Sequence, residues 1–361
     1  MEQTQTVRKT SLYDACVNAG GKMVDFHGWL LPMQFKGIIA EHKAVRESAG
    51  VFDVSHMGQI FFDGPDSFKF LQTMATNNFK NIPGAGAYSH VLNENGGIID
   101  DVIAFCVTPE RFLVVVNSST KDKDFAWFKA KSKDFNVKVI DASDNYSMLA
   151  LQGPKALDIL EKLDAKIKDL PRFNLKEAEL FGEKVYITRT GYTGEDGVEV
   201  MGGAAVINKI FTWSLANGFE PCGLGARDVL RLEAGYLLYG NDMDETRSPY
   251  EANFGWVVKL KKEENFIGKD IMLQQKEHGV KQTRQGFVIT GAGIAREGAA
   301  IFAKDGREIG KITSATFSPM FKAICTGYAP ADLPEGAEVD IDVRGRMVAA
   351  KSVKMPFYKV L

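Results

Sequence analysis

Hydrophobic and polar positions follow two kinds of pattern along the first 280 residues of the chain. In several charged stretches, apolar side chains recur every three to four residues, which is the spacing of an amphipathic helix. Short apolar runs of the kind that form strands lie between these stretches. The predicted helices cover residues 35–49, 65–75, 121–134, 205–217 and 227–239, and the first of them is expected to have a charged face at Glu41, Lys43, Arg46 and Glu47. The predicted strands cover residues 59–62, 97–107, 111–117, 147–152 and 184–190, and a hairpin turn at Thr108-Pro109-Glu110 is expected to join the second and third of them.

The pattern changes near residue 283. From there to Val353, short apolar runs alternate with glycines and charged turns, which is typical of a β-barrel or a β-sandwich. Upstream, helices and strands mix without regular β-α-β alternation, and this mixture favours an α+β fold over a doubly wound sheet. The sequence therefore predicts an α+β region over residues 1–280 and a separate all-β domain over residues 281–361.

Composition and charge narrow the class of protein. The 361 residues are 45% hydrophobic, and 44 Lys and Arg against 46 Asp and Glu give a formal charge of −2. That balance argues against a nucleic-acid-binding protein that relies on bulk positive charge, because counterion release needs a surplus of cations on the binding face. The apolar runs are too short to span a membrane and no apolar signal segment follows the N-terminus, so we expect neither membrane insertion nor secretion.

Cysteine and histidine spacing gives no sign of a metal site or a disulfide framework. No two cysteines have Cys-x-x-Cys spacing, and the five histidines show no metal-ligand spacing. We therefore expect free thiols in a reducing cytoplasm and no bound metal. The sequence also lacks a nucleophile elbow and a phosphate-binding loop. The four cysteines are Cys16, Cys106, Cys222 and Cys325.

A glycine-containing segment, Gly223-Leu-Gly-Ala-Arg-Asp228, opens the predicted helix 227–239. A dinucleotide-binding loop would have a third glycine at position 228, and an aspartate there repels a pyrophosphate at a helix N-terminus. This disfavours NAD and flavin, whereas Asp228 suits the dipole of a first helical turn. Arg227 and Arg231 lie four residues apart on one helix face. They need anionic partners, which are either structural carboxylates or an anionic ligand.

Two adjacent aspartates, Asp100 and Asp101, interrupt the apolar strand predicted over residues 97–107. Neighbouring strand residues point to opposite faces, so we expect at least one carboxylate to lie against an apolar surface, where an unpaired charge is costly. One interpretation places the pair at the start of the strand, bonded to turn amides. The other interpretation is a catalytic carboxylate in a pocket.

Seven motifs in a fixed order resemble those of one enzyme family. Each motif is weak alone, but seven in register from about Thr10 to Tyr358 are very specific. The chain resembles the T-protein of the glycine cleavage system, the tetrahydrofolate-dependent aminomethyltransferase. The motifs are Lys22-Met-Val-Asp-Phe-His-Gly-Trp29, Gly50-Val-Phe-Asp-Val-Ser-His-Met57, Asn95-Gly-Gly-Ile-Ile-Asp-Asp101, Gly191-Tyr-Thr-Gly-Glu-Asp-Gly197, Gly223-Leu-Gly-Ala-Arg-Asp-Val-Leu-Arg-Leu-Glu-Ala234, Asn241-Asp-Met-Asp-Glu245 and Thr313-Ser-Ala-Thr-Phe-Ser-Pro319.

The resemblance implies a fold and a reaction. The family fold is a three-lobed cloverleaf, with two α+β folate-binding lobes interleaved over residues 1–280 and a C-terminal β-barrel over residues 281–361. The family reaction takes the aminomethyl group carried on the lipoyl arm of the H-protein and transfers its carbon to tetrahydrofolate. The products are 5,10-methylenetetrahydrofolate, ammonia and dihydrolipoyl H-protein. The implied co-substrate is tetrahydrofolate and the implied partner is lipoylated H-protein, with no metal, NAD, flavin, nucleic acid or membrane.

The resemblance also implies roles for individual residues. Asp101, and not Asp100, matches the catalytic carboxylate of the family, and Glu199 matches the acid that binds folate. A carboxylate suits a pterin because the amino-pyrimidine edge offers several N–H donors. The other matches to folate-contacting or pocket-lining positions are Arg227, Tyr358, Tyr88, Asn117, Tyr192, Tyr236 and Met57.

Two alternatives stay open at this point. One is another folate-dependent demethylase or methyltransferase on the same scaffold, and the full motif set favours the T-protein over it. The other is a non-catalytic folate-binding repair protein. The presence of Asp101 together with Glu199 and Arg227 argues against it.

The basic stretches 259–262 and 121–123 are either docking sites for an acidic partner or solvated charge. Because the chain begins shortly before the first motif, we expect a bacterial cytoplasmic enzyme or a processed mature form.

Overall fold

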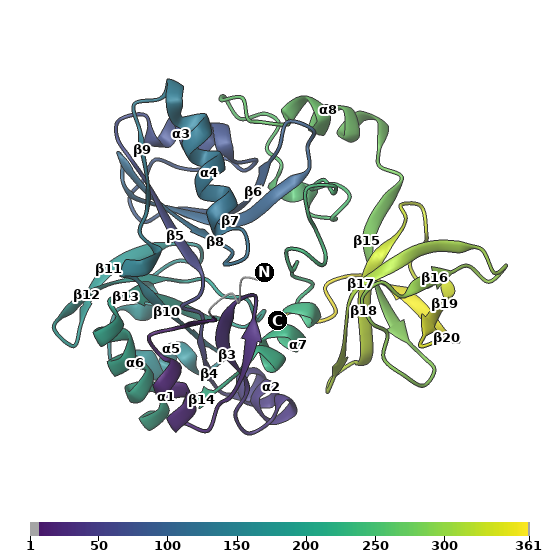
Figure 1. The fold of residues 1–361 in the computed structure, drawn as a ribbon, viewed down its shortest axis with the longest axis horizontal. Coiled ribbons are helices and arrows are strands. Elements are labelled where there is room, and N and C mark those ends of the chain that lie inside the picture. Colours follow the sequence, from purple (N-terminus) through teal and green to yellow (C-terminus); the bar gives the residue numbers. More distant parts are fainter. Residues whose placement is uncertain (1–6, 360–361) are drawn as a thin grey trace, which may run out of the picture. The chain divides into compact units, whose positions relative to one another are not determined.

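The computed structural model describes residues 7–359 of the chain, which divide into two compact units (Figure 1). Unit 1 comprises residues up to Leu71 together with segments 79–88 and 102–227. Unit 2 comprises segments 72–78 and 89–101 and the chain from Asp228 onward. Helices and strands mix in both units and a closed barrel follows near the C-terminus, so the predicted α+β class with a C-terminal barrel is confirmed.

The largest sheet of unit 1 has six strands, and three helices cover it. Helix α6 (Ala204–Ala216) contacts three of the strands, and aliphatic side chains from α1 (Tyr13–Asn18) and α5 (Ala156–Leu160) join the same core. The predicted strand over residues 147–152 has those bounds in the structure. The strand order is β11 (Leu175–Leu180), β12 (Glu183–Thr188), β13 (Gly197–Gly202), β10 (Ser147–Gln152), β4 (Gly50–Asp53) and β14 (Glu220–Pro221).

A small three-stranded sheet lies at the start of unit 1. Its strands are arranged as β1 (Arg8–Lys9), β3 (Trp29–Gln34) and β2 (Lys22–Phe26). His27 and Gly28 form the turn between β2 and β3, with φ angles of 50° and 82°. Positive φ at both turn residues is the type I′ geometry whose twist matches that of the paired strands. The segment 25–29, at the end of the first family motif, is therefore a tight hairpin turn.

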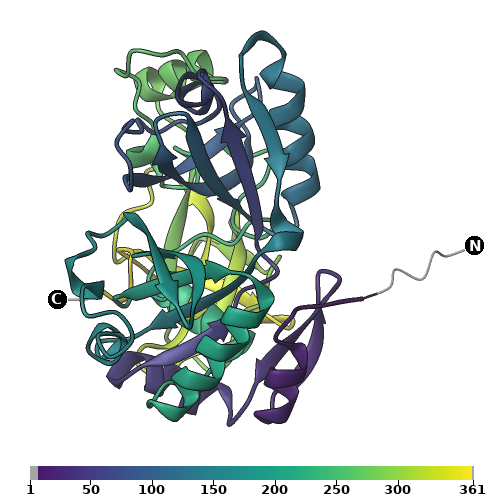
Figure 2. The same cartoon turned by 90° about the vertical axis from the view of Figure 1, so that its left-hand side faces the viewer.

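A five-stranded sheet contains the predicted hairpin of residues 97–117. Strands β7 (Ile98–Thr108) and β8 (Arg111–Val116) pair antiparallel, and β7 passes from unit 2 into unit 1 after Asp101. Helix α4 (Lys121–Lys131) contacts β9 on this sheet, as Figure 2 shows. Helix α3 (Ser67–Met74) follows the strand β5 in the chain. The strand order is β6 (Gly86–Leu92), β7, β8, β5 (Gly58–Asp63) and β9 (Lys138–Asp141).

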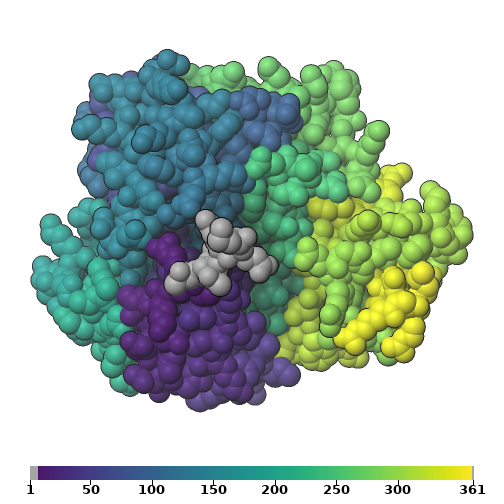
Figure 3. All heavy atoms as spheres, viewed as in Figure 1, coloured from purple at the N-terminus to yellow at the C-terminus, as the bar shows by residue number. Residues whose placement is uncertain are grey.

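The barrel of unit 2 begins at Gln282, where the sequence pattern changes. It follows helix α8 (Lys269–His278) and encloses a core of small aliphatic side chains with Phe287. Closure leaves no free strand edge within the barrel. The segment forms a continuous light-green to yellow region in Figure 3. The order around the barrel is β15 (Gln282–Ile289), β18 (Lys322–Pro330), β17 (Glu308–Ser318), β16 (Ala300–Phe302), β19 (Glu338–Val343) and β20 (Arg346–Val353).

Helix α7 differs most from its predicted bounds. It covers Leu224–Glu233 rather than residues 227–239. Gly235, at φ 74°, ends it with a Schellman motif in which the Tyr236 N–H bonds to the Arg231 carbonyl and the Gly235 N–H to the Leu232 carbonyl. Because α7 begins at Leu224, Asp228 lies beyond the first turn, and the predicted dipole role for it is wrong.

The four cysteines are all buried and free, which confirms the prediction of free thiols. Burial raises the pKa of each thiol, to about 11 for Cys106 and further for the other three. Between residues 7 and 359, no helix combines the length and the apolar character needed to cross a bilayer. Short 3-10 turns complete the described secondary structure at Ser132–Asp134, Ser143–Asn145, Ile167–Asp169 and Gly255–Val257.

Candidate functional site

All nine side chains predicted for the site are partly exposed in the structure. None is sealed in a core, so each is available to a ligand at its own position. Unit 1 holds Met57, Tyr88, Asn117, Tyr192, Glu199 and Arg227, and unit 2 holds Asp101, Tyr236 and Tyr358.

The carboxylate of Glu199 projects from strand β13 in unit 1. Thr190 donates a hydrogen bond of 2.5 Å from Oγ1 to Oε2 of Glu199, and the Thr188 hydroxyl lies 2.7 Å from that of Thr190. Within residues 7–359, no hydrogen bond reaches Oε1 of Glu199. Burial raises the pKa of Glu199, although Thr190 and the charge of Arg227 act in the opposite direction. One oxygen is thus fixed by the protein and the other can accept donors from a ligand.

The turn that carries Tyr192 is held by buried side chains. Gln152 donates from Nε2 to the carbonyl of Thr190 at 3.1 Å and accepts at Oε1 from the Thr193 hydroxyl at 2.9 Å. A Cβ on Gly191 would lie only 1.8 Å from Oε1 of Gln152, so this position has room for glycine alone. Arg46 donates to the carbonyl of Thr193 at 2.8 Å. These contacts fix the backbone on either side of Tyr192.

Arg227 lies in the first turns of α7, and a buried glutamate anchors the start of that helix. Glu41 accepts the N–H of Gly223 at 2.8 Å through Oε2, while its Oε1 accepts the N–H groups of Phe35 and Gly37. The Arg227 N–H bonds to the Gly223 carbonyl at 3.1 Å. The Arg227 guanidinium carbon then lies 4.6 Å from the centre of the Tyr192 ring, in a cation–π contact.

The charged face predicted for the helix over residues 35–49 is only half correct. Helix α2 (Ile38–Glu47) exposes Lys43 and Glu47, which lie 3.8 Å apart. Glu41 is fully buried, and Arg46 forms a buried ion pair of 2.7 Å with Glu195. Buried charges need partners. The partners of Glu41 and of Arg46 lie in loops of the candidate site, so these contacts hold the loops in place.

The loop that carries Met57 is also tightly bonded in unit 1. Asp53 accepts the hydroxyl of Thr10 at 2.6 Å and the N–H of Ser55 at 2.9 Å. The N–H of Met57 bonds to the carbonyl of Val54 at 3.1 Å. Residues 54–57 therefore form a tightly bonded connection between β4 and β5.

The two adjacent aspartates face opposite sides of β7. Asp100 is fully buried, whereas Asp101 is partly exposed, as is Ile103 two residues further along. Asp101 is the fourth residue of the strand. The structure thus places one carboxylate inside the protein and leaves the other accessible, as the strand alternation predicts.

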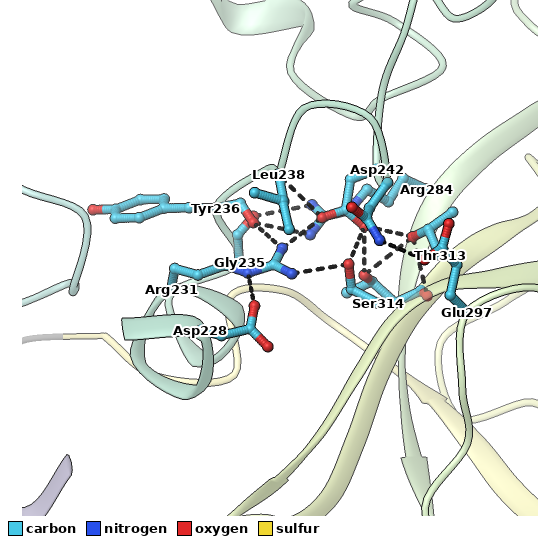
Figure 4. A network of polar contacts seen from close by, with 12 residues as sticks. Asp228, Arg231, Gly235, Tyr236, Leu238, Asp242, Arg284, Glu297, Thr313 and Ser314 are labelled. Carbon is cyan, nitrogen blue, oxygen red and sulfur yellow. Dashed lines mark hydrogen bonds and ion pairs between the residues drawn. The ribbon is translucent and has the colours of Figure 1, made fainter. Parts of the chain in front are cut away.

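A polar network in unit 2 fixes the backbone beside Tyr236 (Figure 4). Arg231 bonds to the carboxylates of Asp228 at 2.8 Å and Asp242 at 2.5 Å and donates to the Tyr236 carbonyl at 3.1 Å. Arg284 of β15 donates to the carbonyls of Gly235 and Tyr236. The Tyr236 ring points away from the network in Figure 4. Of the two interpretations of Arg231, the structure supports structural carboxylates.

The remaining predicted residues are placed by single contacts or by their strands. The N–H of Tyr358 bonds to the carbonyl of Glu233 at the end of α7, at 2.8 Å. Tyr88 lies in β6 and Asn117 directly follows β8. The part of the chain that the structure describes contains no group of three or more His, Cys, Asp or Glu side chains arranged around a metal position.

One lysine of the basic stretch 259–262 is structural, whereas Lys259 and Lys261 are exposed. Lys262 is buried and donates to the carbonyl of Gln72 in helix α3 and to those of Ala75 and Asn77 just after it, at 2.5, 2.5 and 3.0 Å. It is therefore not available to an acidic partner, and it is not solvated charge either. Lys121 bonds to Asp141 at 2.9 Å.

Several residues that build the site were not predicted from the sequence. Thr188 ends β12 opposite Glu199 and Thr190 lies two residues further along the chain, and this spacing within the predicted strand 184–190 could have indicated the support of Glu199. Gln152 is a polar residue that ends the apolar strand β10, which is a weaker signal of the same kind. Glu41 gave no signal, because its partner Gly223 is 182 residues away.

Comparisons with known proteins agree along nearly the whole chain. The family model described as the GCVT N-terminal domain matches residues 12–262, and that of the glycine cleavage T-protein C-terminal barrel domain matches residues 283–359. The aminomethyltransferase of Thermosipho melanesiensis is 43% identical over 357 residues, covering 98% of each chain. That of Staphylococcus saprophyticus is 42% identical over 353 residues, covering 96% of this chain and 97% of the relative.

A solved structure gives the same result in three dimensions. The crystal structure of the glycine cleavage system aminomethyltransferase T from Bartonella henselae matches with a TM-score of 0.92 and 33% sequence identity. The match covers 98% of both chains. The chain therefore belongs to the glycine cleavage T-protein family of aminomethyltransferases.

Proposed function

We propose that this aminomethyltransferase uses tetrahydrofolate as its one-carbon acceptor and the aminomethyl-lipoyl group of the H-protein as its donor, in the bacterial cytoplasm. The C–N bond to ammonia and the C–S bond to the lipoyl arm break, and two C–N bonds to folate nitrogens form. The products are 5,10-methylenetetrahydrofolate, ammonia and dihydrolipoyl H-protein. The reaction transfers a group without net oxidation, so none of its steps needs a redox cofactor.

The arrangement around Glu199 in unit 1 is the observation that carries this proposal. A carboxylate with one free oxygen is suited to the N–H donors of the amino-pyrimidine edge of a pterin. Arg227 stacks on Tyr192 and its charge favours the ionised form of Glu199. We assign Glu199, Arg227 and Tyr192 to folate binding, with Met57, Tyr88, Asn117, Tyr236 and Tyr358 as further lining residues.

We assign catalysis to Asp101. Departure of ammonia from an aminomethyl thioether passes through a cationic carbon, and a fixed carboxylate stabilises such a charge. The same carboxylate can orient a folate nitrogen as it attacks or accept its proton. Formation of methylenetetrahydrofolate from aminomethylated H-protein tests the whole proposal. A demethylase on the same scaffold or a non-catalytic folate-binding protein would give no product in that assay.

Tetrahydrofolate is expected to raise the melting temperature of the protein, and NAD and flavin are not. A ligand that binds only the folded state at 100 times its dissociation constant stabilises that state by about 2.7 kcal/mol. Thermal scans with each compound measure the effect. The folate assignment fails if tetrahydrofolate leaves the melting temperature unchanged, and the exclusion of dinucleotides fails if NAD raises it.

The substitution Glu199→Gln is expected to weaken tetrahydrofolate binding while the fold stays intact. The amide keeps an oxygen for Thr190 but places an NH₂ group toward the donors of the pterin. Loss of a charge-assisted hydrogen bond costs about 1.5–3 kcal/mol, or roughly 10- to 150-fold in affinity. Calorimetry measures it, with Glu179→Gln at an exposed position of β11 as the matched charge control. Equal dissociation constants for both variants would remove Glu199 from the site.

A further inference from the structure

Two buried threonines lie next to the carboxylate of Glu199 in unit 1. Thr190 donates a hydrogen bond of 2.5 Å from Oγ1 to Oε2 of Glu199, and the hydroxyls of Thr188 and Thr190 lie 2.7 Å apart. Glu199 itself is partly exposed, and its Oε1, to which no residue between 7 and 359 donates, is open to solvent. The threonines therefore hold one oxygen of the carboxylate and leave the accessible one to a ligand.

The direction of this hydrogen-bond chain follows from the number of protons. An ionised carboxylate only accepts hydrogen bonds, so the single proton of the Thr190 hydroxyl goes to Glu199. The Thr190 oxygen is then an acceptor, and Thr188 must be the donor in the contact of 2.7 Å. The other acceptor within reach of Thr188, the carbonyl of Glu199, lies further away at 3.4 Å. Successive hydrogen bonds polarise one another, so Thr188 strengthens the bond from Thr190 to the carboxylate.

The backbone around Thr190 keeps its hydroxyl in place. Thr188 is the last residue of β12 and pairs with Glu199 of β13 across the sheet. Two residues further along, the carbonyl of Thr190 accepts a hydrogen bond of 3.1 Å from the buried amide of Gln152. Gly191 packs so closely against the same amide that a Cβ there would lie 1.8 Å from its Oε1. Because a threonine side chain also has few rotamers, the Thr190 hydroxyl has little freedom to turn away from Glu199.

A carboxylate held in this way is prepared for a ligand before the ligand arrives. Fixing a flexible glutamate side chain in advance removes part of the entropy cost of binding. Burial raises the pKa of Glu199, and the hydrogen bond from Thr190 opposes that rise because it stabilises the ionised form. The ionised form is the one that accepts N–H donors.

We propose that Thr190, supported by Thr188, is a positioning residue for folate binding, which holds Glu199 with its Oε1 turned toward the N–H donors of the pterin. Thr190 acts through Glu199 and does not itself contact the ligand. This inference rests on the proposed folate binding at Glu199.

The experiment compares Thr190→Val and Thr190→Ser with the unmodified full-length chain, each titrated with tetrahydrofolate by calorimetry. Thr190→Val keeps the size of the side chain but removes the donor, and it is expected to bind tetrahydrofolate about tenfold more weakly. Thr190→Ser keeps the hydroxyl and is expected to recover most of the affinity. Because Thr190 acts on binding, the single-turnover rate at saturating tetrahydrofolate is expected to change little in either variant.

A double-mutant cycle with Glu199→Ala tests whether Thr190 acts through Glu199. Without the carboxylate, Thr190→Val is expected to have no further effect, so the double variant should bind tetrahydrofolate as weakly as Glu199→Ala alone. A residue that contacts the ligand directly, or that only shapes the loop, would weaken binding by the same factor with and without Glu199.

Thr10→Val is the matched control. Thr10 is a buried threonine of the same unit, and its hydroxyl donates to the carboxylate of Asp53 at 2.6 Å. The control therefore removes the same kind of hydrogen bond from a different carboxylate, and it is expected to lower the melting temperature as Thr190→Val does. Any change that it causes in the affinity for tetrahydrofolate is expected to be the same with and without Glu199→Ala.

Three outcomes would contradict the inference about Thr190. They are normal affinity in Thr190→Val, failure of Thr190→Ser to recover binding, and an equal effect of Thr190→Val with and without Glu199. None of these affects the proposed function, which instead fails if the unmodified chain does not bind tetrahydrofolate. The two conclusions are thus tested separately.

Discussion

Replacing Asp101 with asparagine is expected to lower the rate of methylenetetrahydrofolate formation by about 10²- to 10⁴-fold, with little change in tetrahydrofolate affinity. The carboxylate would act on positive charge that develops only in the transition state, so its loss affects the chemical step rather than binding. Its partial exposure on β7 leaves it accessible to a ligand. Single-turnover kinetics with aminomethylated H-protein, together with calorimetry, separate the two effects.

Asp100→Asn is the matched control for this prediction. The two residues are adjacent and chemically identical, but Asp100 is fully buried on the opposite face of the strand. We therefore expect its substitution to lower stability and to leave the single-turnover rate of the folded fraction near normal. Inactivation by Asp100→Asn, or near-normal rates in both variants, would show that the catalytic carboxylate has been assigned to the wrong residue.

The substitution Asp242→Asn is expected to lower the free energy of unfolding by about 3–5 kcal/mol. Asp242 is fully buried and accepts hydrogen bonds from Arg231, Thr313, Ser314 and the backbone of Leu238. The asparagine is neutral, so the buried guanidinium groups of Arg231 and Arg284 lose the anion that they share (Figure 4). Urea unfolding at neutral pH measures the loss.

A partly exposed carboxylate in the barrel provides the comparison. Asp340 pairs with Lys304 at 2.7 Å, but both side chains are partly exposed, so Asp340→Asn should cost less than about 1 kcal/mol. If the loss at Asp242 is no larger than that at Asp340, the network does not stabilise the fold.

Acid should weaken the same network in the unmodified protein. Burial alone would raise the pKa of Asp242, but the charges of Arg284 and Arg231 hold it well below its usual range. A carboxyl whose pKa is lower in the folded state contributes its full stabilisation above the pKa of the unfolded chain, which is about 3.9. That contribution is expected to be lost progressively as the pH falls below this value.

Local patterns in the sequence predicted the elements well where the period was clear. The strand 147–152 and the change to all-β structure near residue 283 both agree with the structure. The end of α7 was predicted six residues too late, because the apolar spacing continues past Gly235. A single glycine at positive φ overrides that spacing by closing a Schellman motif, and its effect depends on the backbone conformation rather than on periodicity.

The candidate site was predicted largely through the family motifs, and its supporting contacts were not predicted. Glu41 was expected on a charged face and is instead buried against a loop far along the chain. Likewise, the residues near Arg231 in the sequence do not predict its hydrogen bond to Ser314, which lies 83 residues away. Such pairs depend on tertiary structure, so one chain's sequence carries the residue types but not the pairing.

The burial of the four cysteines has a consequence for the chemistry of the carrier arm. In its oxidised form a lipoyl arm is a cyclic disulfide, and an accessible protein thiolate would attack it, forming a mixed disulfide and releasing the arm's other sulfur as a thiolate. Exchange requires a thiolate at an accessible sulfur. All four sulfurs lie in the described structure, are buried and have pKa values above the ordinary value, so each stays protonated and out of reach. A lipoyl arm that arrives in its oxidised form therefore meets no protein thiolate in the described structure that could attack its disulfide.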